Sequence, residues 1–497
     1  MQAKKTFKGM TAAAVAAVLA ASMVPMTAFA AAVTTDTQEI TFNSNVTNLT
    51  YKIYQVATAT VAAGGTAYDY TLVAPFADVA GYETIDKIAA VDSSDAAAKK
   101  DLADALAAKV DTTSTNPTTP LATVAGGEKA SLAPGYYLIL TSGSQMTGAP
   151  ILLSVRSDTP IGTVNAKTSE ITFDKTIEKV TASATGTGLT GGTVGIDKDT
   201  AQVSIGSTVS YKLATKFPNY AETIKATDMT EYSITDIPSA GLTLVDKDGD
   251  GLDKDDFVVT VDGTATTEFT VAAEGNGFKI SFANAFVLTN KTKDVVVTYD
   301  ATVNKNAVVG TAGNPNKATL KFDNNYYEGG TSKEIPDDGK VFTTKLVVNK
   351  TFSDFTKTPT NKYPVAGFTL YAANGTDVIA TASTTEDNNT VEFKGLAAGT
   401  YVLKETTTPD GYKTADPVNI TITANGDTKY DGTYSFTNAI MDTNNTYGTA
   451  NVVNVKGQTL PGTGGMGTII FTVAGAGVVL VAGIMLIVYM KKRKIEE

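Results

Sequence analysis

The sequence predicts a mainly β protein made of tandem β-sandwich domains, with some helix in the first domain and a transmembrane helix at the C-terminus. Threonine, valine, alanine and glycine dominate the chain, a mixture typical of strands and turns in secreted β proteins. Short stretches such as "TVSYKLATKF" and "DVVVTYDATV" alternate apolar and polar residues, with turn residues between them. One long apolar run stands near the C-terminus.

The two ends of the chain have the pattern of targeting segments. Residues 1–30 pass from a basic stretch to an apolar stretch and end in Ala28-Phe29-Ala30, which predicts an export signal cleaved after Ala30. The apolar run from Ile469 to Met490 is long enough to span a bilayer, and "KKRK" follows it as a cytoplasmic stop. We therefore expect an exported chain that its C-terminal helix holds in the membrane.

Between the ends, the pattern divides into regions. Residues 31–168 form a mixed N-terminal domain with an alanine-rich helix, in which four apolar residues recur at a spacing of four: Ala98, Leu102, Leu106 and Val110. Residues 169–342 form a strand-rich middle domain, and its expected strands include "FKISFANAFVL". Residues 343–456 repeat the strand pattern on a smaller scale, and residues 457–497 form the C-terminal tail.

Composition argues against several functions. A net charge of −11 disfavours nucleic-acid binding. The chain has no histidine, which removes Ser-His-Asp and Cys-His catalysis and disfavours zinc sites. No segment argues for a catalytic carboxylate pair or a cofactor-binding loop, so we expect neither an enzyme with turnover nor a bound cofactor. The chain also lacks cysteine, so its robustness must come from something other than disulfides.

Several reactive residues fall on the apolar face of predicted strands. In "ITFDKTI", Lys175 shares a face with Ile171, Phe173 and Ile177. Each of the last two domains has a lysine on its first strand, a carboxylate in the middle and an asparagine on its last strand. The two sets are Lys175, Asp236 and Asn316, and Lys350, Glu405 and Asn454. The alternative for each residue is a strand-end position that turns to solvent.

Such a set can crosslink the chain to itself. Desolvation lowers the pKa of a lysine and raises the pKa of a carboxylate. A neutral amine is a nucleophile, and a protonated carboxyl can polarise the asparagine carbonyl and shuttle protons. Proximity in the folded core would then give a Lys–Asn isopeptide bond and ammonia without an external enzyme. The bond forms once, so this chemistry is self-modification.

Three stretches resemble a known family. "YVLKETTTPDGY" resembles the E-box of Cna B-type domains, which have an immunoglobulin-like fold, and "LPGTGG" with the following span and basic tail resembles the LPxTG signal that sortases read. "YSITDIPSAGLTL" and "GNPNKATLKFDNN" resemble the second domain of Gram-positive fimbrial major subunits. The chain between the export signal and the span therefore resembles the backbone pilin of a sortase-assembled pilus.

The resemblance implies roles for the polar residues. Lys350 and Asn454 would form one bond with Glu405 assisting, and Lys175 and Asn316 would form another with Asp236 assisting. Three further asparagines remain rivals to Asn316: Asn314, Asn324 and Asn325.

The resemblance also implies how copies would be joined. A sortase would read Leu460, Pro461, Gly462, Thr463 and Gly464, attack the carbonyl of Thr463 and release Gly464 onward with the span. Thr463 would pass to a lysine of the next copy or to the cell wall. Lys167 stands where the family's "YPKN" lysine belongs, although Asn165-Ala166 replaces Tyr-Pro and Thr168 replaces the asparagine. The alternative is that Lys167 is an ordinary solvated lysine.

An acidic stretch, "DKDGDGLDKDDF", resembles a calcium-binding loop. Asp246, Asp248 and Asp250 have the alternating spacing of ligands, and Gly251 supplies the turn. Phe257 occupies the position of the final bidentate acid, which Asp253, Asp255 or Asp256 could replace. The alternative is a solvated acidic hairpin.

The sequence thus predicts a structural subunit of a covalent pilus on a Gram-positive cell surface. Its partners would be a sortase, neighbouring copies of itself and peptidoglycan, and the sequence identifies no host ligand. The alternative is a single wall-anchored adhesin with the same internal bonds, which differs in whether Lys167 acts as an acceptor. An anchored enzyme has little support.

Overall fold

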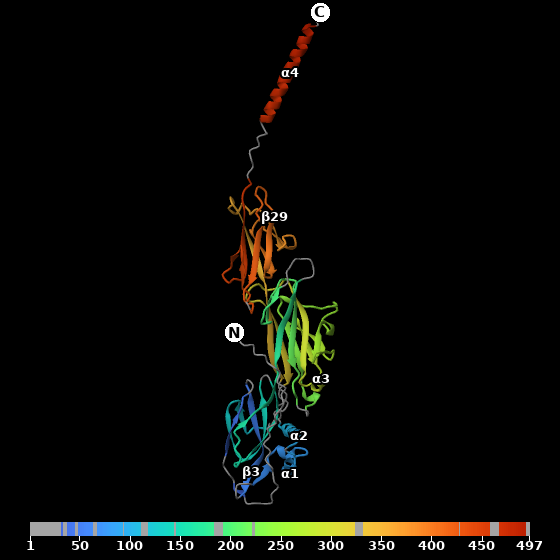
Figure 1. Cartoon of the computed structure of the whole chain (residues 1–497), viewed down its shortest axis with the longest axis vertical. Coiled ribbons are helices and arrows are strands. Elements are labelled where there is room, and N and C mark those ends of the chain that lie inside the picture. The colour runs from blue at the N-terminus through green and yellow to red at the C-terminus, as the bar shows by residue number, and fades with distance from the viewer. Residues whose placement is uncertain are drawn as a thin grey trace, which may run out of the picture.

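The computed structural model describes residues 31–32, 37–44, 48–62, 67–92, 94–110, 118–143, 146–182, 192–220, 224–323, 332–426, 428–457 and 467–493. The expected export signal, residues 1–30, and the expected sortase motif, residues 460–464, lie outside this set. Figure 1 shows three β-rich regions following one another along the long axis, with helix α4 (Gly467–Arg493) at one end. Within α4, Phe471–Lys492 is long and apolar enough to cross a membrane. The fold is mainly β, as the sequence predicts.

The N-terminal region combines sheets with helices on one side. Sheet β1-β3-β7-β9 also pairs β4 and β5 with β3, and small sheets β10-β2-β6 and β11-β8 complete the region. The bounds are β1 (Ala31–Ala32), β2 (Gln38–Phe42), β3 (Thr50–Ala62), β4 (Tyr68–Leu72), η1 (Phe76–Asp78), α1 (Ile85–Ala89), α2 (Ala96–Ala107), β5 (Ala122–Ala125), β6 (Lys129–Leu132), β7 (Gly135–Ser142), β8 (Met146–Ala149), β9 (Ile151–Val155), β10 (Thr163–Val164) and β11 (Lys167–Glu170).

Helix α2 confirms the two central residues of the predicted apolar stripe, whereas Ala98 is half-buried and Val110 lies beyond the end of the helix at Ala107. Asp95 begins the helix as its N-cap, because its carboxylate accepts hydrogen bonds from the amides of Ala97 and Ala98 at 2.8 and 3.1 Å. Leu102 and Leu106 are buried in a cluster with residues of β3 and β7, so the helix covers one face of that sheet. The opposite face packs toward β2 and β6.

The middle region is a sandwich of two sheets around one core. One sheet has the order β12-β15-β22-β18-β19 with β17 beside β22, and the other has the order β13-β14-β24-β23-β16-β21-β20. The bounds are β12 (Phe173–Thr181), β13 (Thr193–Val194), β14 (Thr200–Gln202), β15 (Thr208–Lys216), η2 (Ala226–Asp228), β16 (Tyr232–Pro238), β17 (Leu242–Leu244), η3 (Lys254–Asp256), β18 (Val258–Val261), β19 (Thr264–Ala265), β20 (Thr270–Glu274), β21 (Gly277–Phe282), α3 (Asn284–Thr289), β22 (Asp294–Val303), β23 (Asn314–Asp323) and β24 (Ser332–Phe342).

Two features of the middle region differ from the sequence prediction. The expected strand "FKISFANAFVL" ends at Phe282, and helix α3 follows it. Asn284 is the first residue of that helix, and its side-chain amide donates to the carbonyls of Ala226 and Met229, which ties the helix to η2. Second, Asn316 lies on β23 and is followed by β24, so it is not on the last strand of its sandwich.

The C-terminal region is a smaller sandwich. Its sheets have the orders β28-β25-β33-β32 and β27-β26-β29-β30-β31, and its core is separate from that of the middle region. The bounds are β25 (Thr344–Phe352), β26 (Gly367–Ala372), β27 (Val378–Ser383), β28 (Thr390–Leu396), β29 (Gly399–Thr407), β30 (Val418–Ala424), β31 (Tyr434–Phe436), β32 (Ile440–Met441) and β33 (Gly448–Asn454). Only Thr343 separates the end of β24 from the start of β25.

Candidate crosslinking sites

The middle region brings Lys175, Asp236 and Asn316 into its core. All three side chains are fully buried, as strand alternation predicts, and Ile171, Phe173 and Ile177 are buried on the same face as Lys175. Lys175 comes from β12 in one sheet, while Asp236 and Asn316 come from neighbouring strands of the other. Because Asp236 is opposite Ala318 and Pro238 is opposite Asn316, the carboxyl and the amide are diagonal neighbours on one face.

A tyrosine hydroxyl connects these three side chains. The Lys175 amine Nζ donates to the Asp236 carboxyl Oδ2 and, at 2.8 Å, to the Tyr299 hydroxyl. That hydroxyl donates to Asp236 Oδ2 at 2.7 Å and accepts from Asn316 Nδ2 at 2.9 Å. Tyr299 did not emerge from sequence reasoning, because on β22 it looks like one more core residue in the alternating series of Val295 and Val297.

Burial pushes both ionisable groups of the middle site toward their neutral forms. It lowers the pKa of Lys175, against the attraction of the Asp236 carboxylate. It also raises the pKa of Asp236, against the effect of Lys175 and of hydrogen bonds from Tyr299 and Asn316. Transfer of a proton from the ammonium to the carboxylate would remove two opposite charges from an apolar core and leave a nucleophilic amine.

The rival asparagines differ from Asn316 in their surroundings. Asn314 is also buried, but its side chain is bound to a loop: Oδ1 accepts from the amide of Val308 at 2.8 Å, and Nδ2 donates to the carbonyl of Val308 at 3.0 Å. Asn324 and Asn325 lie outside the described residues. Of the candidates that the structure describes, Asn316 is therefore the one in contact with the lysine–carboxylate pair through Tyr299.

The C-terminal region assembles the second set with a different geometry. Lys350 and Asn454 are fully buried and Glu405 is 8% exposed, on β25, β33 and β29 respectively. Strands β25 and β33 run parallel, with Lys350 opposite Val452 and Phe352 opposite Asn454. Lysine and asparagine are therefore diagonal neighbours on adjacent strands.

The contacts of the second set run through Glu405 and the backbone. Asn454 Nδ2 donates to Glu405 Oε2 at 2.9 Å, and the same oxygen accepts from the Ala415 amide at 2.7 Å. Lys350 Nζ donates to the carbonyls of Thr351 and Val452 at 2.8 and 3.3 Å. Burial lowers the pKa of Lys350 to about 8, against the attraction of Glu405, so about a tenth of the amine is neutral at pH 7, far more than at its usual pKa.

Both sites leave the same kinds of atom without a hydrogen-bond partner. Within the described part of the chain, one carboxyl oxygen and the amide oxygen of each site are buried and unpartnered: Asp236 Oδ1, Asn316 Oδ1, Glu405 Oε1 and Asn454 Oδ1. A buried acceptor without a donor is costly. At Asp236, whose pKa burial raises, a proton would supply a donor, and a protonated carboxyl is also the species that activates an asparagine carbonyl.

Lys167 begins β11 and is opposite Ala149 of β8. Val164 is buried and Ala166 packs against the N-terminal core. The side chain of Lys167 lies outside what the structure describes. The linking role of Lys167 stays a prediction.

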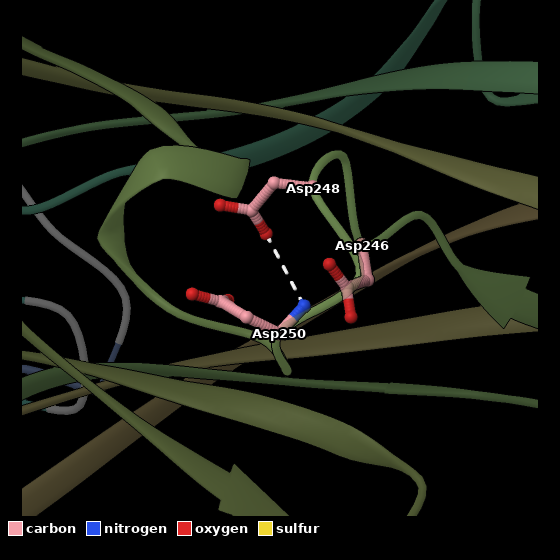
Figure 2. Close-up of side chains that lie close together, drawn as sticks. All are labelled: Asp246, Asp248 and Asp250. Carbon is pink, nitrogen blue, oxygen red and sulfur yellow. Dashed lines mark hydrogen bonds between the residues drawn. The ribbon is translucent and has the colours of Figure 1, made fainter.

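The acidic loop gathers three carboxylates in one place. Figure 2 shows Asp246, Asp248 and Asp250 around a turn, and their carboxylate oxygens lie within 4.8 Å of one another. Hydrogen bonding and repulsion from the Asp248 carboxylate raise the pKa of Asp250. The two oxygens of Asp246 accept from the amides of Gly249 and Gly251, at 2.6 and 2.9 Å. These bonds fit a self-supported turn as well as a cation site.

The position of the final calcium ligand does not fit a metal loop. Phe257 is buried, with its ring 4.5 Å from that of Phe278. Its neighbour Asp256 uses both carboxylate oxygens on the amides of Lys247 and Asp253. Calcium binding stays a prediction for the three clustered aspartates.

Comparison with known proteins adds two family matches. Residues 353–435 match the SpaA model, a prealbumin-like fold domain, and residues 452–497 match the LPXTG cell wall anchor motif. The anchor match supports the predicted location, a cell-wall-attached surface protein of a Gram-positive bacterium.

The chain is also similar to streptococcal surface proteins. It is 27% identical over 299 residues to the trypsin-resistant surface T6 protein of Streptococcus pyogenes serotype M6. The matched region covers 56% of this chain and 53% of the relative. This chain therefore spans about half the length of that relative. The solved structure of the T6 backbone pilin of serotype M6 Streptococcus pyogenes has the same fold, with a TM-score of 0.57 and 18% identity over 86% of this chain and 100% of the other.

Proposed function

We propose that the chain is a structural subunit of a covalently polymerised pilus on the surface of a Gram-positive bacterium. The observation that carries this proposal is the anchor motif at residues 452–497, at the end of a chain related to a streptococcal surface protein. A sortase would cut after Thr463 and join it to Lys167 of the next copy, or to peptidoglycan at the base. The chain would be a substrate of that enzyme, and α4 would hold it in the membrane until cleavage.

The two buried sets would form intramolecular isopeptide bonds, Lys175–Asn316 and Lys350–Asn454. Two kinds of evidence support this reaction: the burial of each lysine beside an asparagine and a carboxyl, and pKa shifts that favour a neutral amine. In each reaction the amine nitrogen would bond to the asparagine Cγ, and the amide nitrogen would leave as ammonia. Asp236 and Glu405 would move the protons. The proposed bonds would take the structural place of disulfides in a chain without cysteine.

Intact-mass spectrometry of the chain from residue 31 to 463 tests the internal bonds. We expect a mass lower than that of the sequence by two ammonia molecules. Asn316→Ala should restore one of them and Asn454→Ala the other. Asn314→Ala is the matched control, because it removes a buried amide two residues away and should leave both bonds in place. If the chain with its own sequence has the mass that the sequence predicts, the crosslinks are ruled out.

Polymerisation is tested by the size of wall-released material. We expect a ladder of high-mass, detergent-resistant species that disappears with Lys167→Ala. Lys179→Ala is the matched control, because Lys179 is an exposed lysine on the nearby strand β12. A single wall-linked band in the unmodified strain would favour the adhesin alternative, and a ladder that survives Lys167→Ala would place the linking lysine elsewhere.

A further inference from the structure

We propose that Tyr299 is a catalytic residue of the middle crosslinking site and relays a proton from Asp236 to the departing amide nitrogen of Asn316. The inference rests on the proposed Lys175–Asn316 bond and adds a fourth participant to it. Its basis is contact: one hydroxyl lies at 2.8 Å from the attacking amine, 2.7 Å from the carboxyl and 2.9 Å from the nitrogen that must leave.

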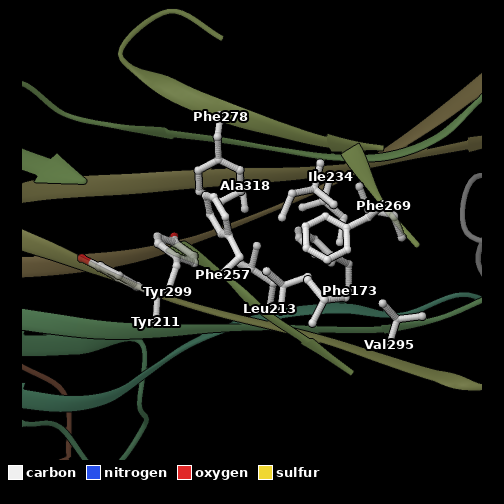
Figure 3. Close-up of a cluster of buried hydrophobic side chains, with 14 of the residues drawn as sticks. Phe173, Tyr211, Leu213, Ile234, Phe257, Phe269, Phe278, Val295, Tyr299 and Ala318 are labelled. Carbon is white, nitrogen blue, oxygen red and sulfur yellow. The ribbon is translucent and has the colours of Figure 1, made fainter. Parts of the chain in front are cut away.

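The hydroxyl is held in place by packing on both sides of its ring. Tyr299 is 4% exposed on β22, with Tyr211 stacked on it at 5.5 Å and Phe278 edge-on at 4.9 Å. Figure 3 shows this aromatic group beside Phe257 in the middle core. A group fixed in this way needs little rearrangement during the reaction, which is what electrostatic and proton-transfer catalysis requires.

The hydrogen-bonding capacity of the phenol matches the three contacts. A tyrosine hydroxyl has one proton to donate and lone pairs that accept. The proton goes to Asp236, and the lone pairs accept from Lys175 and Asn316. Burial, together with the negative charge of Asp236, raises the pKa of Tyr299 well above its usual range. The phenol therefore stays protonated at rest and is suited to exchanging one proton for another.

The proposed sequence balances atoms and charge. Lys175 first passes a proton to Asp236, which gives a neutral amine and a neutral acid. The amine lone pair bonds to Cγ of Asn316, and the carbonyl π electrons move to Oδ1. Asp236 then protonates the Tyr299 oxygen while Tyr299 gives its own proton to Nδ2. The carbonyl re-forms and the C–N bond breaks with its electron pair on nitrogen, which departs as ammonia. Asp236 takes a proton from the new amide nitrogen, and Tyr299 ends as it began.

The C-terminal site provides an internal contrast. There Asn454 Nδ2 bonds directly to Glu405 at 2.9 Å, and the ring beside the lysine is Phe352, with its centroid 4.2 Å from Nζ. The carboxyl thus reaches the leaving nitrogen without an intermediate. The hydroxyl relay should matter for one bond of the chain and not for the other.

The test follows bond formation in newly synthesised chains spanning residues 31–463, by time-resolved intact mass and peptide mapping. We expect Tyr299→Phe to slow formation of the Lys175–Asn316 bond by roughly 100-fold or more, because general acid–base catalysis usually contributes about 100- to 10,000-fold. The Lys350–Asn454 bond should form at its normal rate in the same molecules. Tyr232→Phe is the matched control: it removes another buried hydroxyl of the same core, which donates to the carbonyl of Lys216 at 3.0 Å instead of to a reacting group.

The outcomes separate this inference from the function on which it rests. If the unmodified chain loses no ammonia, the proposed crosslinks fail. If it loses ammonia and Tyr299→Phe closes the middle bond at the normal rate, the relay fails. Near-UV circular dichroism reports whether the variant folds. If Tyr299→Phe does not fold, 3-fluorotyrosine at position 299 serves instead, because it keeps the shape and the hydroxyl while lowering the phenol pKa. The rate at which the Lys175–Asn316 bond forms should then differ from that of the chain with tyrosine, whereas the rate for Lys350–Asn454 should not. The same Lys175–Asn316 rate with tyrosine and with 3-fluorotyrosine would overturn the relay.

Discussion

At the scale of residues, the two buried lysines have different hydrogen-bond partners for their amines. A buried ammonium is costly unless it is paired or hydrogen-bonded. Lys175 is paired with Asp236, whereas Lys350 donates to two backbone carbonyls. An isopeptide bond would replace each amine by a neutral amide and so remove the charge altogether. The proposed reaction therefore relieves a cost that folding imposes, which favours the crosslinked state in addition to proximity.

The lowered pKa of Lys350 predicts a pH dependence when the bond is absent. In Asn454→Ala the free lysine would have a pKa of about 8 in the folded chain and its usual 10.5 in the unfolded chain. Between these values the unfolded chain binds more protons, so the free energy of unfolding should rise with pH, by about 3 kcal/mol across the window. Below pH 8 both states are protonated and the dependence ends. Denaturant unfolding across this range measures it.

The control for this titration removes the lysine as well. Lys350→Met combined with Asn454→Ala has the same missing bond and no amine, so its C-terminal transition should lack the rise between pH 8 and 10.5. A rise of equal size in both variants would assign the effect to another group. The unmodified chain should also lack the rise, because its lysine nitrogen would be an amide.

Sequence alternation located most of the buried polar residues but not their connection. The alternation of side chains along one strand is enough to place Lys175 or Glu405 on the inward face, because it does not depend on which strand is the partner. It cannot show which inward residues meet across two sheets. Tyr299 was missed for that reason: its ring belongs to the core pattern, and only the packing of β22 against β16 and β23 places its hydroxyl between the other three groups.

At the scale of elements, the two bonds would constrain their sandwiches differently. Lys350–Asn454 would join adjacent parallel strands, β25 and β33, the first and last of the C-terminal region. Lys175–Asn316 would join the two sheets of the middle region and leave β24 outside the closed loop. Each loop exceeds a hundred residues, and by analogy with disulfides its closure would stabilise by about 4–5 kcal/mol through the unfolded chain.

The position of β24 predicts where a stretched chain yields first. Tension would pass through the Lys175–Asn316 bond and leave along β24, whose Gly339 is opposite Asn316. Because β23 and β24 are antiparallel, force enters and leaves at the same end of the pair and breaks its hydrogen bonds one after another. We expect single-molecule stretching to release the stretch between Asn316 and Phe342, an extension of roughly 90 Å. The closed loops should not extend.

Asn316→Ala is the comparison for this stretching experiment. Without the bond, the middle region should release a far longer segment that begins at β12. If the unmodified chain shows no step, β24 is held by more than its pairing with β23, and its parallel pairing with β14 would be the candidate. Sequence reasoning could not place this weak point, because it took Asn316 to lie on the last strand.

At the scale of the whole molecule, the middle and C-terminal regions are joined by more than the chain. The backbone amide of Ile205 donates to the carbonyl of Gly395 at 2.9 Å. The amide of Ala398 donates to Gln202 Oε1 at 2.7 Å, and the amide of Tyr430 donates to Thr200 Oγ1 at 3.0 Å. Each bond joins a residue before Thr343 in the sequence to a residue after it. Together with the chain at Thr343, they should hold the two regions at a fixed angle. No pattern in the sequence marks them, because a backbone group takes part in each of the three bonds.

The buried side chain of Gln202 makes this joint testable. Gln202→Ala would leave the Ala398 amide without its acceptor, at a cost of about 1–3 kcal/mol, and should loosen the angle between the regions. Because the chain has no cysteine, spin labels can be placed on two introduced cysteines, at the exposed positions Glu268 and Asp410, and the distribution of distances between them can be measured. We expect a broader distribution in Gln202→Ala.

Thr193→Ala is the matched control, since Thr193 Oγ1 accepts from the same glutamine at 3.1 Å but takes no part in the bond to Ala398. A normal width in Gln202→Ala would mean that the remaining contacts hold the joint, and a fibre built from such chains would then owe its stiffness here to the backbone bonds.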